Sequence, residues 1–397
     1  MFTVHGTVTP GFEPVEAAFR ENFERRGEVG AAACAWHDGE KVVDLWGGLA
    51  DRENDRPWNE DTLVVIFSST KGMVALCLLM LADRGKLDYD RPVADYWPEF
   101  AAGGKETITV RELLNHRAGL AVVERPLPLS DWCEPAQVGP ALASQRPQWK
   151  PGADQGYGAI SAGAYAAELF RRIDGRSLGR FFAAEVAGPL DADAFIGLPI
   201  DLETRVATLY PANLCAARLR LLPEILTGRT VEGRLERALL VKRSLPSRAF
   251  GNPDLGRKGL EVFNEPDVHR MEIPWAGGIA SARGLVKIYA ALAMGGALEG
   301  TRLCRPESVE PLKRRQSWSE RDRVVQKPLG FSQGFLKEEC HVFSPGEEAF
   351  GHSGTGGALG LADPDRRLAF AYVMNRMDVR IRSPRCLALC HALYGCI

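Results

Sequence analysis

The stretch FSSTKGMVALCLLML (residues 67–81) places a single lysine, Lys71, three positions after Ser68 in an otherwise small and apolar run. It follows the short β-branched run TLVVIF (62–67), and the apolar pattern ends near Gly85. This order predicts a strand that leads directly into a buried helix. Residues i and i+3 share one face of a helix, so Lys71 lies beside the Ser68 hydroxyl if the helix begins there.

This spacing suits nucleophilic catalysis. A serine hydroxyl becomes a strong nucleophile only when a neighbouring group takes its proton. Burial lowers the pKa of a lysine, and a neutral Lys71 amine can accept that proton. The first turn of a helix also leaves backbone N–H groups free for an oxyanion. In the alternative interpretation, Ser68 only caps the helix and the Lys71 amine extends to solvent. The chain contains no other S-x-x-K.

Both ends of the chain predict parts of one sheet. Residues 13–27 repeat apolar positions with helical spacing, and two apolar runs then flank Asp38-Gly39, a hairpin signal. Residues 356–377 predict two strands around the turn at 363–365, and residues 382–395 predict a closing helix. We therefore expect an α+β fold with one antiparallel sheet, built from both termini and flanked by the N- and C-terminal helices.

The middle of the chain, about 85–250, predicts helix and loop with little strand. ITVRELLNHRAGL (108–120) predicts a helix, whereas residues 245–267 are dense in Gly, Pro and Asn and predict a long surface loop. GGIASARGLVKIYAALAMGG (277–296) predicts a strong helix. The expected division is a sheet domain of residues 1–84 and 270–397, with a mainly helical, loop-rich domain of residues 85–269 inserted between its strands.

Composition excludes several functional classes. The 397 residues are 45% hydrophobic and carry a formal charge of −2, so no basic face is expected for nucleic acid. No run reaches the roughly 18 apolar residues of a membrane span, and the N-terminus lacks a secretory signal pattern, so no membrane partner is expected. Nine scattered cysteines without CxxC spacing predict reduced thiols in the cytoplasm. Cys386 and Cys390 have helical spacing, which we interpret as two buried thiols and not as a metal site.

Two further stretches contain chemically active residues. WKPGADQGYGAISAG (149–163) places Tyr157 among glycines ahead of a predicted helix. FGHSGTGGALGLADP (350–364) places His352, Ser353 and Gly354 at the entry to a predicted strand. Glycine allows another backbone or a substrate to approach closely. Taken alone, each stretch is also explained by a packed loop tyrosine or by a capping histidine.

Together, these three stretches resemble the serine β-lactamase-like superfamily, in which S-x-x-K, a tyrosine motif and a K/H-[ST]-G strand follow one another. The similarity is greatest to the family VIII carboxylesterases, the esterase branch related to class C β-lactamases. It covers nearly the whole chain and implies the β-lactamase/transpeptidase-like fold shared with penicillin-binding proteins. The stretches that match that branch, in its order, are LWGG, DTLVVIFSSTKG, ITVRELLNHRAGL, KPGADQGYGAISAG, DGRSLGRFF, SARGLVKIYAAL and FGHSGTGGALGLADP.

The resemblance implies a role for each site residue. Ser68 matches the acylated nucleophile, Lys71 its motif lysine, and Tyr157 the tyrosine that shares proton transfer with that lysine. The backbone N–H groups of Ser68 and Thr355 match the two oxyanion donors. The segment His352-Ser353-Gly354 matches the substrate-binding strand, with the histidine in the place of the K-T-G lysine. No metal or organic cofactor is required.

Departures from the β-lactamase pattern favour esters over β-lactams as the substrates. Ala159 stands where class C β-lactamases usually carry an asparagine, and the chain has neither K-T-G nor S-D-N. A histidine is mostly neutral at pH 7 and holds a β-lactam carboxylate less well than a lysine does. The G-x-S-x-G of an α/β-hydrolase is also missing around Ser353.

We therefore expect a serine carboxylesterase that cleaves small, short-chain esters through an acyl-enzyme at Ser68. Alternatives within the superfamily are an acyltransferase, a D-aminopeptidase or a weak β-lactamase. Outside it, the alternative is a binding protein that kept the fold without catalysis, which a fluorophosphonate would not label. The sequence predicts neither the natural substrate nor the oligomeric state.

Overall fold

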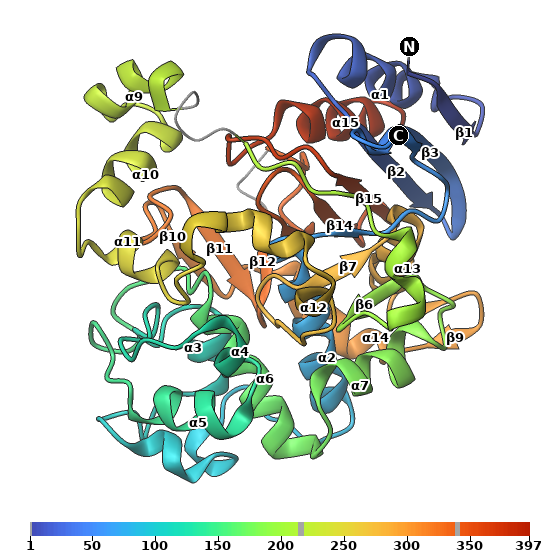
Figure 1. Cartoon of the computed structure of the whole chain (residues 1–397). Coiled ribbons are helices and arrows are strands. Elements are labelled where there is room, and N and C mark those ends of the chain that lie inside the picture. The colour runs from blue at the N-terminus through green and yellow to red at the C-terminus, as the bar shows by residue number, and fades with distance from the viewer. Residues whose placement is uncertain (1, 213–217, 338–341) are drawn as a thin grey trace.

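The computed structural model describes residues 2–212, 218–337 and 342–397. Within them, an antiparallel sheet of ten strands joins the two ends of the chain (Figure 1). The N-terminal strands join the C-terminal ones where β2 (Gly30–His37) pairs with β15 (Leu368–Met374). From edge to edge, the strands are β1 (Val4–Val8), β3 (Glu40–Asp51), β2, β15, β14 (Leu359–Asp363), β13 (Phe350–Ser353), β12 (Phe335–Lys337), β11 (Leu329–Ser332) and β10 (Ser317–Ser319), with β4 (Arg56–Pro57) beside β3. The predicted α+β sheet from both termini is confirmed.

The two predicted hairpins form at their turn signals. His37 pairs with Glu40 across a two-residue turn, in which Asp38 has φ 51° and Gly39 has φ 83°. Positive φ at both central residues is what a type I′ turn requires, and it explains the Asp-Gly pair. The C-terminal hairpin joins β14 to β15, as the turn at 363–365 predicts.

Helices cover both faces of the sheet. The two terminal helices, α1 (Glu13–Arg25) and α15 (Pro384–Tyr394), pack against each other over one face (Figure 1). On the other face, α13 (Ala282–Ala293) packs against β2, β14 and β15. It approaches so closely that a Cβ on Gly360 of β14 would lie 2.0 Å from the Tyr289 ring. Glycine is therefore required where α13 crosses the sheet.

A second, three-stranded sheet leads into the opening stretch. From edge to edge, its strands are β5 (Val64–Val65), β7 (Gly278–Ala280) and β6 (Ala194–Ile196). The predicted strand at 62–67 thus contributes only two residues. Next along the chain, α2 (Thr70–Asp83) is buried on every side from Thr70 to Leu81, as its uniformly apolar sequence predicts.

Three sequence predictions need correction. The helix expected at 277–296 begins at Ala282, because β7 takes the preceding residues and the Ser281 side chain caps the first turn. The helix expected at 108–120 is confined to α3 (Val110–Leu114), since His116 adopts φ 59°. The loop expected at 245–267 instead contains α11 (Leu245–Phe250) and the 3₁₀ segment Gly256–Asn264. Other α-helices of the described residues are α4 (Leu129–Trp132), α5 (Pro135–Ser144), α6 (Ser161–Asp174), α7 (Leu178–Phe182), α9 (Leu222–Thr227), α10 (Val231–Leu240), α12 (Pro266–His269) and α14 (Pro306–Val309).

The division into residues 1–84 plus 270–397 and residues 85–269 stays a prediction. None of the helices in the described ranges combines the length and apolar character needed to cross a membrane.

Candidate active site

Ser68 lies in a short 3₁₀ turn (Phe67–Ser69) between β5 and α2, and its side chain is partly exposed. The two residues that follow it fix this turn to its neighbours. Ser69 Oγ donates a hydrogen bond of 3.0 Å to the carbonyl of His352 on β13. Thr70 Oγ1 accepts one of 2.8 Å from the N–H of Gly278 on β7. The start of α2 is therefore held between two strands, and Ser68 projects from a rigid position.

The turn after β13 lies against the backbone that precedes Ser68. A Cβ on Gly354 would stand 2.2 Å from the carbonyl oxygen of Ile66, so only glycine permits this approach. The hydrogen bonds within the turn start from the N–H groups of Gly354 and Gly357. They do not use the N–H of Thr355, a residue that is exposed as a whole. The segments that carry the two predicted oxyanion donors are thus adjacent.

Lys71 is buried beside the serine. Its Nζ lies 3.0 Å from Ser68 Oγ and donates a hydrogen bond of 2.9 Å to the carbonyl of Trp275. Burial lowers the pKa of Lys71 from its ordinary 10.5 to about 7, because the charged ammonium loses its hydration. A large fraction of the amine is therefore neutral near pH 7. The alternative in which Lys71 extends to solvent is wrong.

Tyr157, in the loop before α6, completes the cluster. Its side chain shares a hydrogen bond with that of Ser68, and Lys71 Nζ lies 5.1 Å from its ring centroid. The ring packs against those of His116 and Phe331, with centroid separations of 5.1 Å and 6.2 Å. Burial raises the pKa of Tyr157, and the hydrogen bond to Ser68 opposes this only in part. The phenol is consequently protonated at neutral pH.

Sequence reasoning did not find Asp322, which fixes the tyrosine backbone. This carboxylate is buried, and its Oδ1 accepts N–H bonds of 3.0 Å from Tyr157, 2.8 Å from Val324 and 3.1 Å from Val325. Its Oδ2 accepts a longer bond from the Gln155 side chain. In the sequence, SERDR resembles an exposed charged run, so no local signal marks Asp322.

His116 is a second residue that no motif singled out. It is buried, and its Nδ1 accepts a 2.9 Å hydrogen bond from the N–H of Gly158, one residue after Tyr157. Its ring lies 4.1 Å from that of Phe331. Burial, together with the nearby charge of Lys71, holds the pKa of His116 well below its usual range. A neutral imidazole therefore holds the backbone of Gly158, next to the Tyr157 N–H that Asp322 binds.

His352 faces the same cluster from β13. It is only 3% exposed, and its ring centroid lies 6.2 Å from that of Tyr157. Its Nδ1 lies 2.8 Å from the carbonyl of Ser353, which can only accept, so Nδ1 carries the hydrogen and Nε2 is an acceptor. Burial and the charge of Lys71 lower the pKa of His352 to about 3. The side chain is thus uncharged at neutral pH.

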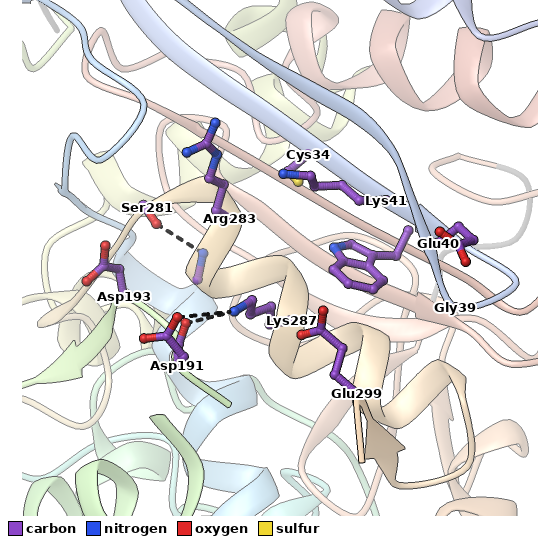
Figure 2. Close-up of a pocket in the computed structure, with 12 residues that line it drawn as sticks. Cys34, Gly39, Glu40, Lys41, Asp191, Asp193, Ser281, Arg283, Lys287 and Glu299 are labelled. Carbon is purple, nitrogen blue, oxygen red and sulfur yellow. Dashed lines mark hydrogen bonds and ion pairs between the residues drawn. The ribbon is translucent and has the colours of Figure 1, made fainter. Parts of the chain in front are cut away.

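A separate cavity of about 690 Å³ lies between the β2–β3 hairpin and the start of α13 (Figure 2). None of the predicted site residues lines it. Its cations already have partners: Lys41 and Arg283 pair with Asp44, and Lys287 donates to the carbonyl of Asp191. This cavity is distinct from the cluster around Ser68, which is where the structure brings Lys71, Tyr157 and His352 together.

Comparison with known proteins identifies the family. The family model described as "Beta-lactamase" matches residues 15–384. The chain belongs to the β-lactamase family. Within that family, it is 36% identical to the "Esterase/beta-lactamase LipL" of Mycobacterium tuberculosis over 376 residues, which are 94% of this chain and 83% of LipL.

Two solved structures are similar to this chain over its whole length. The crystal structure of a family VIII carboxylesterase superimposes with a TM-score of 0.88 at 37% identity and covers all of both chains. A penicillin-binding protein homologue from Caulobacter crescentus gives a TM-score of 0.85 at 33% identity, again over all of both chains. The resemblance to family VIII carboxylesterases and the associated fold are confirmed.

Proposed function

We propose that this protein is a serine hydrolase that cleaves carboxylic esters through an acyl-enzyme at Ser68. The observation that carries the proposal is the 3.0 Å separation of Lys71 Nζ and Ser68 Oγ in a buried site that lowers the lysine pKa to about 7. The similarity to LipL and to a family VIII carboxylesterase supports ester hydrolysis as the reaction.

Lys71 acts as the general base in this proposal. The carbonyl of Trp275 takes one N–H of the neutral amine, and this leaves the lone pair for the Ser68 hydroxyl. As Ser68 Oγ attacks the ester carbonyl, its proton passes to the amine. The positive charge then formed on Lys71 is stabilised by the negative charge that develops on the substrate oxygen.

Tyr157 acts as the proton donor to the leaving alcohol. Its raised pKa keeps the phenol protonated, and its hydroxyl lies within hydrogen-bond reach of Ser68, where the leaving oxygen departs. Lys71 can replace the lost proton through the same cluster. Water then attacks the acyl-enzyme by the reverse proton path and releases the acid.

Two backbone N–H groups, those of Ser68 and Thr355, hold the oxyanion in this mechanism. The close approach of Gly354 to Ile66 brings their segments together. Main-chain donors in a fixed turn need no reorganisation when charge develops, and one such donor typically contributes 10²–10³-fold in rate.

The site favours esters of small alcohols over β-lactams. His352 stays uncharged because its pKa is about 3, so it offers an acceptor lone pair where a β-lactam carboxylate would need a cation. Ala159 is buried beside Tyr157 and can neither donate nor accept a hydrogen bond. A simple ester needs neither contact.

The test compares p-nitrophenyl butyrate hydrolysis by the wild type, Ser68→Ala and a control, Ser144→Ala. Ser144 is an exposed serine at the end of α5. We expect no turnover by the Ser68 variant, unchanged turnover by the Ser144 variant, and native circular dichroism for both. Substantial turnover by a folded Ser68→Ala protein would overturn the assignment.

A further inference from the structure

A helical unit projects from one side of the molecule. Residues 218–250 contain α9, α10 and α11, and Figure 1 shows α9 and α10 standing away from the rest of the fold. An ion pair of 2.9 Å between Arg218 and Glu236 joins the start of this unit to α10. The first residues of the unit therefore lie beside α10.

The exposed surface of this unit, residues 218–250, is unusually apolar. The unit holds six of the nine large hydrophobic side chains that are exposed in the described residues. Leu222 and Leu226 are four residues apart in α9 and so share one helical face, and Leu219 lies just before this helix; Leu219 is 74% and Leu226 71% exposed. Leu240, Val241 and Phe250 complete the set. Exposed apolar groups gathered on one projecting unit mark a contact surface.

The same unit is strongly basic. Between residues 218 and 250 the sequence has eight Lys or Arg and three Glu, a net charge of +5, whereas the whole chain carries −2. Five of the cations are exposed and form no ion pair with any described residue. They are Arg220, Arg229, Arg237, Lys242 and Arg243. Exposed leucines and cations without an ion-pair partner thus lie together on one projecting unit, with Arg237 on α10 and the other four cations just outside the ends of α9 and α10.

We propose that the α9–α10 unit docks this protein on an anionic lipid surface. Helices that combine exposed leucines with basic side chains lie in the headgroup region, where the leucines enter the acyl boundary and the cations meet lipid phosphates. A second copy of the chain fits less well, because a two-fold contact would bring two surfaces of charge +5 together. This proposal departs from the sequence-based expectation of no membrane partner, which rested on the lack of a spanning run and of a secretory signal pattern; docking on a lipid surface requires neither.

The docking unit is continuous with the site around Ser68. Helix α11 follows α10, and its Ala249 packs in the apolar cluster that contains Tyr157 and Val324, with Leu245 against the same cluster. A lipid surface held by α9 and α10 therefore lies next to the rim of the site. If the proposed ester hydrolysis holds, on which this step rests, its substrates include esters dissolved in such a surface.

The experiment measures binding of the full chain to sedimented vesicles of phosphatidylcholine, with and without phosphatidylglycerol. The test variant is Leu222→Ser/Leu226→Ser. The matched control is Ile200→Ser, because Ile200 is 71% exposed, as Leu226 is, but lies outside the unit. A second test variant, Arg229→Glu/Arg237→Glu, changes the charge alone. Far-ultraviolet circular dichroism reports that each variant is folded, and hydrolysis of p-nitrophenyl butyrate in solution is measured separately.

We expect binding only to vesicles with the anionic lipid, and weakening by salt. Affinity should fall about tenfold or more in the leucine and arginine variants and stay unchanged in Ile200→Ser. Absence of wild-type binding, equal binding to neutral vesicles, or equal loss in the control would overturn the proposal. A dimer that the leucine variant dissociates would assign the surface to a second copy instead. If the wild type binds vesicles but hydrolyses no ester, that result would count against the proposed function alone.

Discussion

Replacing Lys71 by methionine should abolish ester hydrolysis while making the folded protein more stable at neutral pH. The folded pKa of Lys71 is about 7, below the ordinary 10.5 expected for the unfolded chain. Between these values the unfolded chain binds more protons, so stability rises with pH across this window and is lowest below pH 7. At about 1.4 kcal/mol per pH unit, burying this lysine costs about 4 kcal/mol at pH 7 and about 2 kcal/mol at pH 9.

Methionine removes this cost and keeps a side chain of similar length. The variant also leaves the carbonyl of Trp275 without its N–H donor, which costs about 1–3 kcal/mol at any pH. At pH 7, the free energy of unfolding of the variant should therefore exceed that of the wild type by about 1–3 kcal/mol. The free energy of unfolding of the variant minus that of the wild type should then fall by about 2 kcal/mol between pH 7 and pH 9.

The assay is urea denaturation of both proteins at pH 7 and pH 9, with Lys150→Met as the control because Lys150 is exposed. The control should show no such pH dependence. In the wild type, kcat/KM should rise as pH increases through about 7, when Lys71 loses its proton. A stability difference that does not change with pH would refute the reasoning, since it would mean that Lys71 keeps its ordinary pKa in the folded protein.

Three further predictions concern the residues around Lys71. Tyr157→Phe should lower kcat by about 10²-fold or more, and combining it with Lys71→Ala should add little; additive losses would place the two groups in separate steps. Asp322→Asn should lower kcat less than Asp322→Ala, because one acceptor oxygen remains for the Tyr157 N–H, and equal losses would contradict this. The wild type should prefer p-nitrophenyl butyrate to nitrocefin in kcat/KM, and His352→Lys should narrow that preference; a preference for nitrocefin would show that the uncharged histidine does not set the substrate class.

Local patterns predicted the centre of the fold. The Asp38-Gly39 turn, the C-terminal hairpin and the terminal helices each carry their signal within a few residues, and each forms as expected. Strands β10, β11 and β12 were not predicted. They are only three or four residues long, too short for a periodic pattern, and they exist because they pair with one another and with β13.

In the candidate site, too, local sequence patterns predict some contacts and leave others unpredicted. Ser68 and Lys71 share one helical turn, so their 3.0 Å contact follows from i, i+3 spacing. Tyr157 and His352 came from the family resemblance, because nothing in their own stretches says that they meet Ser68. Asp322 and the carbonyl of Trp275 act through hydrogen bonds between residues far apart in the sequence. Such contacts leave no pattern in the chain, and only the folded arrangement reveals them.

The central claim, an acyl-enzyme at Ser68, is tested most directly by trapping the intermediate. The protein is mixed with p-nitrophenyl butyrate, quenched in acid during turnover, digested and analysed by peptide mass spectrometry. We predict a single butyryl group on the peptide that contains Ser68 in the wild type, and none on that peptide in Ser68→Ala. A butyryl group on another residue in the wild type, or turnover without any acylated peptide, would contradict the account.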